Sequence, residues 1–130
     1  MRDIARRADV GLATLLRHFP TREALFEALL RSNLDALTRS AAGLEASSAP
    51  GEALLTWFRE WVEFARSHEG VVAMMAAAHK NPDSALYSSC AAVHSASGRL
   101  LRRAQAEGTA RADMTGDDLF GLMSALGWLV

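Results

Sequence analysis

The sequence contains a single cysteine, Cys90, among its 130 residues. One cysteine excludes an internal disulfide and a zinc site built on several cysteines, and this usage suits a reducing compartment. No run of about eighteen apolar residues could cross a bilayer, and no basic segment followed by an apolar run resembles a secretory leader. We therefore expect a soluble, cytoplasmic protein that does not enter a membrane.

Catalytic and metal-binding signatures are also missing. The chain has no Gly-rich phosphate loop, no HExxH zinc motif and no nucleophile elbow. It has no Glu-x-x-His pair of the kind that builds di-metal centres in helical bundles, and His68 and Glu69 are adjacent, so they cannot bind one metal from one helix face. The sequence predicts a protein that is not an enzyme and that carries no cofactor or metal.

Charge is almost balanced over the whole chain, which has a net charge of -1, but it is unevenly distributed. Residues 1–31 contain six arginines and four acidic residues, a local balance of +2, and the remainder stands at -3. A basic first segment is compatible with a surface that faces nucleic acid. An ordinary solvated helix surface explains so small a difference equally well, and charge alone leaves both interpretations open.

Strand signals are almost absent, because β-branched residues are few while Ala, Leu, Arg and Glu, which favour helices, dominate. The sequence therefore predicts an all-α fold. Apolar residues recur at helical spacing in seven segments, most of them separated by Gly, Pro or Asn. The expected helices are 1–8, 12–18, 21–42, 52–67, 71–78 and 84–107, followed by a last helix that starts at a capping box over 115–118 and continues to the end.

The first two expected helices are short and are joined by a tight turn, which is the arrangement of a helix-turn-helix module. Asp9 stands where the turn needs a residue that tolerates left-handed backbone, and Gly11 can begin the next helix. We expect Ile4 to fix the first helix to the body beneath it, and Val10 and Leu15 to fill the angle between the two helices. The outer face of the second helix then remains free to enter the major groove of DNA.

The residues that form this motif resemble a known family. The stretch IARRADVGLATLLRHFPTREALFEALL, residues 4–30, is similar to the DNA-binding region of the TetR family of bacterial transcriptional regulators. The similarity covers residues 1–31, about a quarter of the chain, and its spacing is specific. It implies a helix-turn-helix region with a connecting helix over residues 1–42. It also implies a helical effector-binding and dimerisation domain over residues 43–130, which the connector from Leu44 to Gly51 would join to the first.

The resemblance also implies roles for single residues. Thr14 matches a position of the recognition helix that contacts DNA, and Leu12 and Ala13 lie at its leading turn, within reach of base edges. His18 matches a position that hydrogen-bonds to phosphate, and Arg22 matches one that clamps phosphate with help from a helix N-terminus.

Two further positions complete the predicted DNA-binding set. Arg17 is a candidate for phosphate contact or for packing. Leu16 occupies the place of a frequent phosphate-binding Tyr, just as Leu12 occupies that of a common Lys, so this chain departs from the family there. The predicted set is Leu12, Ala13, Thr14, Leu16, Arg17, His18 and Arg22.

Compared with the family, the chain is expected to be cut at both ends. The family has a further helix before the segment that starts at Met1, and it pairs a second helix with the one that starts at Thr115. Apolar side chains near both ends are therefore expected to lack neighbours. They are Ile4, Val10, Phe19 and Phe26 near the start, and Leu119, Phe120, Leu122, Met123, Leu126, Trp128 and Leu129 near the end.

Aromatic and methionine side chains gather in the second half of the chain. They are suited to an apolar effector pocket, because Met adapts its shape and Trp offers one polar group, but they are equally suited to a packed core. Cys90, His79 and His94 are near them and could add polar contacts, although packing also explains a lone His or Cys. The predicted pocket residues are Trp57, Trp61, Phe64, Met74, Met75, Cys90, His94 and Met123.

Together these features predict a DNA-binding transcriptional regulator, expected to be a ligand-responsive repressor. Its expected partners are double-stranded operator DNA, a small apolar effector and a second copy of the chain, which would form a homodimer through the C-terminal helices. The alternative is a helical small-molecule-binding or interaction protein whose DNA-binding region is vestigial.

Overall fold

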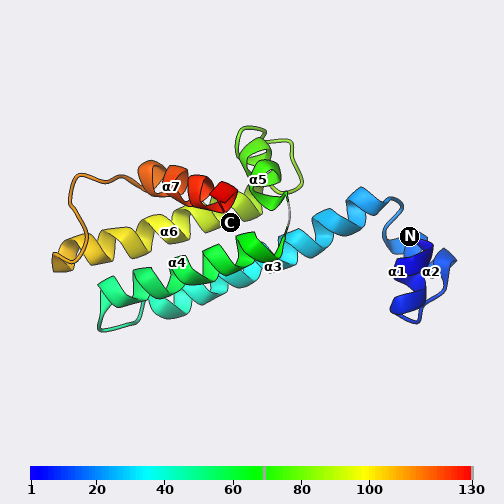
Figure 1. Ribbon diagram of the computed structural model, residues 1–130, viewed down its shortest axis with the longest axis horizontal. Helices are drawn as coiled ribbons and strands as arrows, with labels where there is room; N and C mark the ends of the chain where they lie inside the picture. Colours follow the sequence, from blue (N-terminus) through cyan, green and yellow to red (C-terminus); the bar gives the residue numbers. More distant parts are fainter. Residues whose placement is uncertain (69, 130) are drawn as a thin grey trace. The chain divides into compact units, whose positions relative to one another are not determined.

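The computed structural model describes residues 1–68 and 70–129, with the backbone alone for Glu23 and Trp128 (Figure 1). These residues form helices and no strand, which confirms the predicted all-α fold. None of the described helices is long and apolar enough to span a membrane. The helices are α1 (Arg2–Arg7), α2 (Leu12–His18), α3 (Arg22–Leu44), α4 (Pro50–Ser67), α5 (Val71–His79), α6 (Tyr87–Glu107) and α7 (Gly116–Leu129).

The chain forms two compact units, Met1–Ser32 and Asn33–Val130. The first unit contains α1, α2 and the beginning of α3, and the second contains the rest of α3 and the four later helices. The predicted functional division after residue 42 remains a prediction, because compactness does not assign a function.

The core of the second unit lies where α4, α6 and α7 pack against one another, with α5 against α6 and α7 (Figure 1). Trp57 and Trp61 of α4 are completely or almost completely buried there. Their indole N–H groups donate to backbone carbonyls of other helices, Trp57 Nε1 to Leu37 O at 3.0 Å and Trp61 Nε1 to Met123 O at 3.1 Å. A buried indole needs such a partner, so these bonds tie α3 and α7 to α4.

The ends of the helices follow local chemistry. Gly108 ends α6 in the left-handed conformation, with φ +86°, which costs glycine little because it lacks a β carbon. The backbone N–H of Thr115 donates to Asp118 Oδ2 at 2.9 Å, and the N–H of Asp118 donates to Thr115 Oγ1 at 3.1 Å. The predicted capping box is therefore confirmed.

Two predicted boundaries around the connector are wrong. Helix α3 continues through Gly43 to Leu44, because a single glycine lowers helix stability by only about 1 kcal/mol. Helix α4 begins at Pro50 and not at Glu52. Proline is tolerated in the first turn, where its missing N–H has no partner to lose. The connector is correspondingly shorter than predicted.

The predicted start of α6 at Ser84 is also wrong, since the helix begins at Tyr87. The side chains of Asn81 and Ser84 accept the backbone N–H groups of Asp83 and Leu86, at 3.1 and 3.2 Å. Such short polar side chains compete with helical hydrogen bonds and hold the segment in turns.

Helix α7 is less exposed than predicted. It packs against α4, α5 and α6 with one face, which buries Leu119, Phe120 and Met123. Leu122 and Leu129 remain exposed, at 45% and 81%. Leu126 is half-buried, and the side chain of Trp128 lies outside the described residues. The prediction of an unpartnered apolar helix therefore holds for one face only.

Candidate nucleic-acid interface

The turn between α1 and α2 is built as the sequence predicts. Asp9 adopts the left-handed conformation with φ +57°, and Gly11 precedes α2 with extended backbone. The N–H of Val10 donates to Ala5 O at 3.0 Å, which ties the turn back to α1. A short polar residue tolerates this backbone, so α1 stops and the chain changes direction within a few residues.

The two helices pack through a small apolar contact. Ala5 of α1 and Leu15 of α2 are buried. The prediction that Val10 also braces α2 is wrong, since its side chain is 43% exposed. Val10 lies in the turn and not on a helix face, so α1 and α2 meet through Ala5 and Leu15 without covering it.

The opposite face of α2 is open to solvent. Ala13, Thr14, Leu16, Arg17 and His18 are all exposed, and α2 thus carries most of the predicted DNA-binding residues on its surface. Thr14, Arg17 and His18 are three and four positions apart, so they lie on the same side of this short helix. Burial of Leu15 therefore fixes which side of α2 is presented.

Two further predicted residues differ in their setting. Leu12, at the start of α2, is half-buried and contributes less surface than predicted. Arg22 is exposed and is the first residue of α3, so it comes from a different helix. Thr21 Oγ1 accepts the N–H of Ala24 at 3.0 Å and caps α3. A guanidinium next to the positive end of a helix favours an anion such as phosphate.

Helix α1 adds basic side chains that are not among the predicted DNA-binding residues. Arg2, Arg6 and Arg7 are exposed on the helix that packs against α2. Arg6 is paired with Asp3 one turn earlier. The net positive charge of residues 1–31 was the feature of the sequence that pointed to these side chains.

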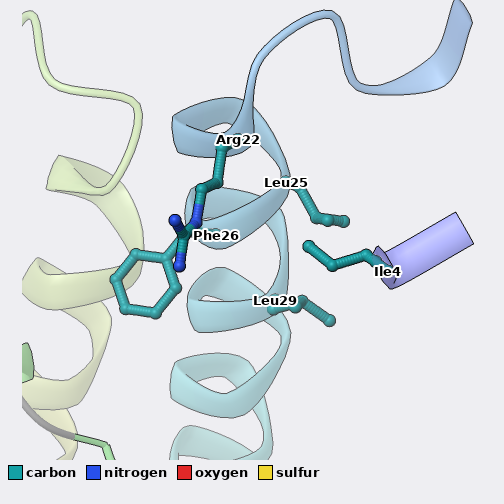
Figure 2. A pocket seen from close by; sticks show the side chains of 5 residues that line it. All are labelled: Ile4, Arg22, Leu25, Phe26 and Leu29. Atoms are coloured by element: carbon teal, nitrogen blue, oxygen red, sulfur yellow. The ribbon is translucent and has the colours of Figure 1, made fainter. Parts of the chain in front are cut away.

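An apolar groove of about 450 Å³ lies between α1 and the first turns of α3. It is lined by Ile4, Arg22, Leu25, Phe26 and Leu29, and Figure 2 shows Ile4, Leu25 and Leu29 pointing toward one another. Ile4 and Phe26 are each 37% exposed. Val10 is exposed as well but Phe19 is half-buried, so the expected exposure holds for three of these four side chains, and Ile4 fixes α1 less completely than predicted.

The predicted effector-pocket residues lie in the second unit. Most of them are buried, and Met74 and His94 are half-buried. Burial raises the pKa of the Cys90 thiol from 9.0 to about 11, because the thiolate would lose its hydration. Their role in binding a ligand stays a prediction. Among the described residues, no group of three His, Cys, Asp or Glu side chains could hold a metal ion.

Comparisons with known proteins agree at both ends of the chain. Residues 1–29 match the family described as bacterial regulatory proteins, tetR family, and residues 49–130 match the family described as transcriptional regulator SbtR-like, C-terminal domain. The crystal structure of TetR transcriptional regulator SCO0520 from Streptomyces coelicolor is similar to this chain, with 35% identity and a TM-score of 0.72. The match covers 97% of this chain and 72% of that one. No curated protein matches the sequence.

Proposed function

Because this chain belongs to the TetR family of DNA-binding transcriptional regulators, we propose that α2 is the helix that reads its operator DNA. Regulators of this family are generally not enzymes. The observation that carries the proposal is the two-sided character of α2, whose Leu15 is buried while Thr14, Arg17 and His18 are exposed together. A single helix with one anchored and one open side fits the major groove.

Base contacts are assigned to the leading turn of α2. The Thr14 hydroxyl donates to or accepts from a base edge, and its methyl group contacts a thymine methyl. Ala13 packs against the same groove floor, and Leu12 contributes its exposed part. Such contacts distinguish one base pair from another.

Phosphate contacts are assigned to His18, Arg17 and Arg22. A hydrogen bond from His18 and charge from the two guanidinium groups would hold the helix at a fixed depth. Leu16 adds an apolar contact to the sugar backbone, where it replaces a hydroxyl common in the family. These contacts add affinity on any sequence and set the register in which Thr14 meets the bases.

We also propose that the protein acts as a homodimer through its C-terminal helices, in which the exposed face of α7, with Leu122 and Leu129, packs on a second copy. Two recognition helices related by a two-fold axis read two half-sites about one DNA turn apart, roughly 34 Å. The operator should therefore be a near-palindrome.

Ligand response is proposed to pass through α3, which runs unbroken from Arg22 to Leu44. A small apolar effector among the aromatic and methionine side chains would displace α4. Trp57 Nε1 donates to Leu37 O at 3.0 Å, and Ser40 Oγ donates to Glu60 Oε2 at 2.6 Å, so α3 follows α4. Release of DNA by the effector-bound form makes the protein a ligand-responsive repressor.

The test begins with selection of binding sites for the purified protein from a random-sequence duplex library. Affinity for the selected duplex is then measured by fluorescence anisotropy for Thr14→Ala and His18→Ala. Each variant should lose about 1–3 kcal/mol of binding free energy while remaining folded by circular dichroism. Thr14→Ala should also relax the sequence preference, whereas His18→Ala should weaken binding to all duplexes alike.

Thr56→Ala is the matched control, because Thr56 is also an exposed threonine but lies on α4. It should leave affinity unchanged. Unchanged affinity in both α2 variants would remove α2 from the DNA interface. Failure to enrich any sequence would favour the alternative of a helical binding protein with a vestigial DNA-binding region.

A further inference from the structure

Three rings from three different helices meet in the second unit. They belong to His79, the last residue of α5, to His94 of α6 and to Phe120 of α7. The two imidazoles are stacked, with centroids 5.4 Å apart and planes 23° apart. Phe120 lies 4.9 Å from His79 and 5.1 Å from His94. Both imidazoles are half-buried, so this cluster lies between the protein interior and solvent.

One member of the cluster has a carboxylate partner. His94 Nε2 lies 2.9 Å from Asp117 Oδ1, in the first turn of α7. The histidine side chain is 23% exposed and the aspartate side chain 87% exposed. The His94 ring also approaches Gly116, so α7 begins directly against it. This contact is a polar side-chain link between α6 and α7.

We propose that protonation of His94 tightens the attachment of α7 to α6, so that His79, His94 and Asp117 act as a proton-dependent latch on the last helix. Neutral imidazole makes one ordinary hydrogen bond to the carboxylate. Imidazolium makes a charge-assisted bond, which is about twice as strong. The strength of this contact therefore depends on whether the imidazole is protonated.

The stacked neighbour limits the latch to one positive charge. A second proton on His79 would place two cations ring to ring with only the Asp117 carboxylate to balance them. Lys80, which directly follows α5, adds positive charge near the same end of that helix. We therefore assign the latch proton to His94, the imidazole with the carboxylate partner.

Arg102 of α6 lies on the same helix face as His94, and its Nη1 would lie 3.3 Å from a β carbon added at Gly98, which itself approaches Gly116, so this guanidinium also faces the start of α7. Several other charged groups on the surrounding helices have partners of their own. On α4, Glu60 accepts from Ser40 and Glu63 pairs with Arg66. On α7, Asp118 is held by the capping box. On α3, Asp35 accepts a hydrogen bond from Ser89 of α6. The Cys90 thiol of α6 stays neutral because burial raises its pKa to about 11.

Hydrogen exchange of the α7 backbone amides tests the latch in the intact chain, because it reports local opening of single helices. Protection factors already divide out the intrinsic effect of pH on exchange. In the unsubstituted protein, those of α7 should rise about two- to five-fold relative to those of α4 when the pH falls from about 8 to about 6. The latch does not depend on DNA binding, so a negative result for the latch would not contradict the DNA-binding role proposed for α2, and the reverse also holds.

Asp117→Asn should abolish this rise, because the amide keeps a hydrogen bond but removes the charge. His94→Gln should also make the α7 protection factors independent of pH, because it removes the imidazole that takes up the proton. Asp113→Asn is the matched control, since Asp113 is an exposed carboxylate that pairs with Arg111 and not with a histidine. It should keep the full rise.

Three results would overturn the proposal. They are a flat profile in the unsubstituted protein, a rise in Asp117→Asn equal to that of the unsubstituted protein, and a fall in α7 protection on acidification. His79→Gln supplies a further check. It removes the competing cation, so the rise should be retained or become larger, and its loss would assign the proton to His79 instead.

Discussion

The close approach of α5 and α7 gives a stability prediction that depends on one atom. Gly127, near the end of α7, lies against Val72 of α5. A β carbon added at Gly127 would overlap Val72 Cγ2 and lie 3.4 Å from Val72 Cβ. Val72 is only 7% exposed, and its branched side chain is stiff about the first torsion angle. Gly127→Ala should therefore force the two helices apart and lower the free energy of unfolding.

The expected magnitude is a difference between two opposing effects. Overpacking of a filled core costs about 1–3 kcal/mol. Replacing glycine by alanine inside a helix gains up to about 1 kcal/mol, and less near a helix end. We expect a net loss of about 1–2 kcal/mol for Gly127→Ala. Gly121 lies in the same helix, is exposed and has no atom within 4 Å of an added β carbon, so Gly121→Ala should gain about 0.5–1 kcal/mol.

Urea unfolding followed by circular dichroism measures both changes under the same conditions. A second pair of variants isolates the contact itself: in a Val72→Ala background, Gly127→Ala should no longer destabilise. The coupling between positions 72 and 127 should then favour the double variant over the sum of the single changes. The argument is refuted if Gly127→Ala is as stable as Gly121→Ala, or if truncating Val72 leaves its cost unchanged.

Two further predictions concern the second unit. Because burial raises the pKa of Cys90 from 9.0 to about 11, the unfolded chain ionises first, and the free energy of unfolding should fall as the pH rises from 9.0 towards about 11. Urea titrations across that range should show this loss, and its persistence in Cys90→Ala would assign it to another group. Thr115→Ala should lower the free energy of unfolding by about 0.5–2 kcal/mol because the Asp118 N–H loses its acceptor, whereas Thr115→Ser should keep most of the stability. Equal unfolding midpoints for both Thr115 variants would contradict the capping argument.

Local signals in the sequence predicted the helical elements well. The ends at Asp9 and Gly108 and the start at Thr115 depend on the backbone preferences or hydrogen bonds of neighbouring residues, and the structure has all three. The errors at Gly43 and Pro50 have the same local origin. Both residues weaken helices on average, yet each is tolerated at its place in the helix.

The candidate site was predictable in part. Helical spacing predicted that Leu15 is buried and that Thr14 and His18 are exposed, because a short helix packs one side against the protein and turns the other to solvent. The exposure of Val10 was not predictable in this way. It depends on how α1 and α2 pack against each other, and only Ala5 and Leu15 are buried there.

What the sequence determined by itself is the set of helices, the turn that makes two of them a DNA-reading module, and the family to which the chain belongs. All three depend on residues that are close together along the chain. Only the tertiary structure decided which face of α7 is covered and that His79, His94 and Phe120 meet. Those residues come from different helices, and helical periodicity specifies the direction of a side chain on its own helix but not the helix that it will meet.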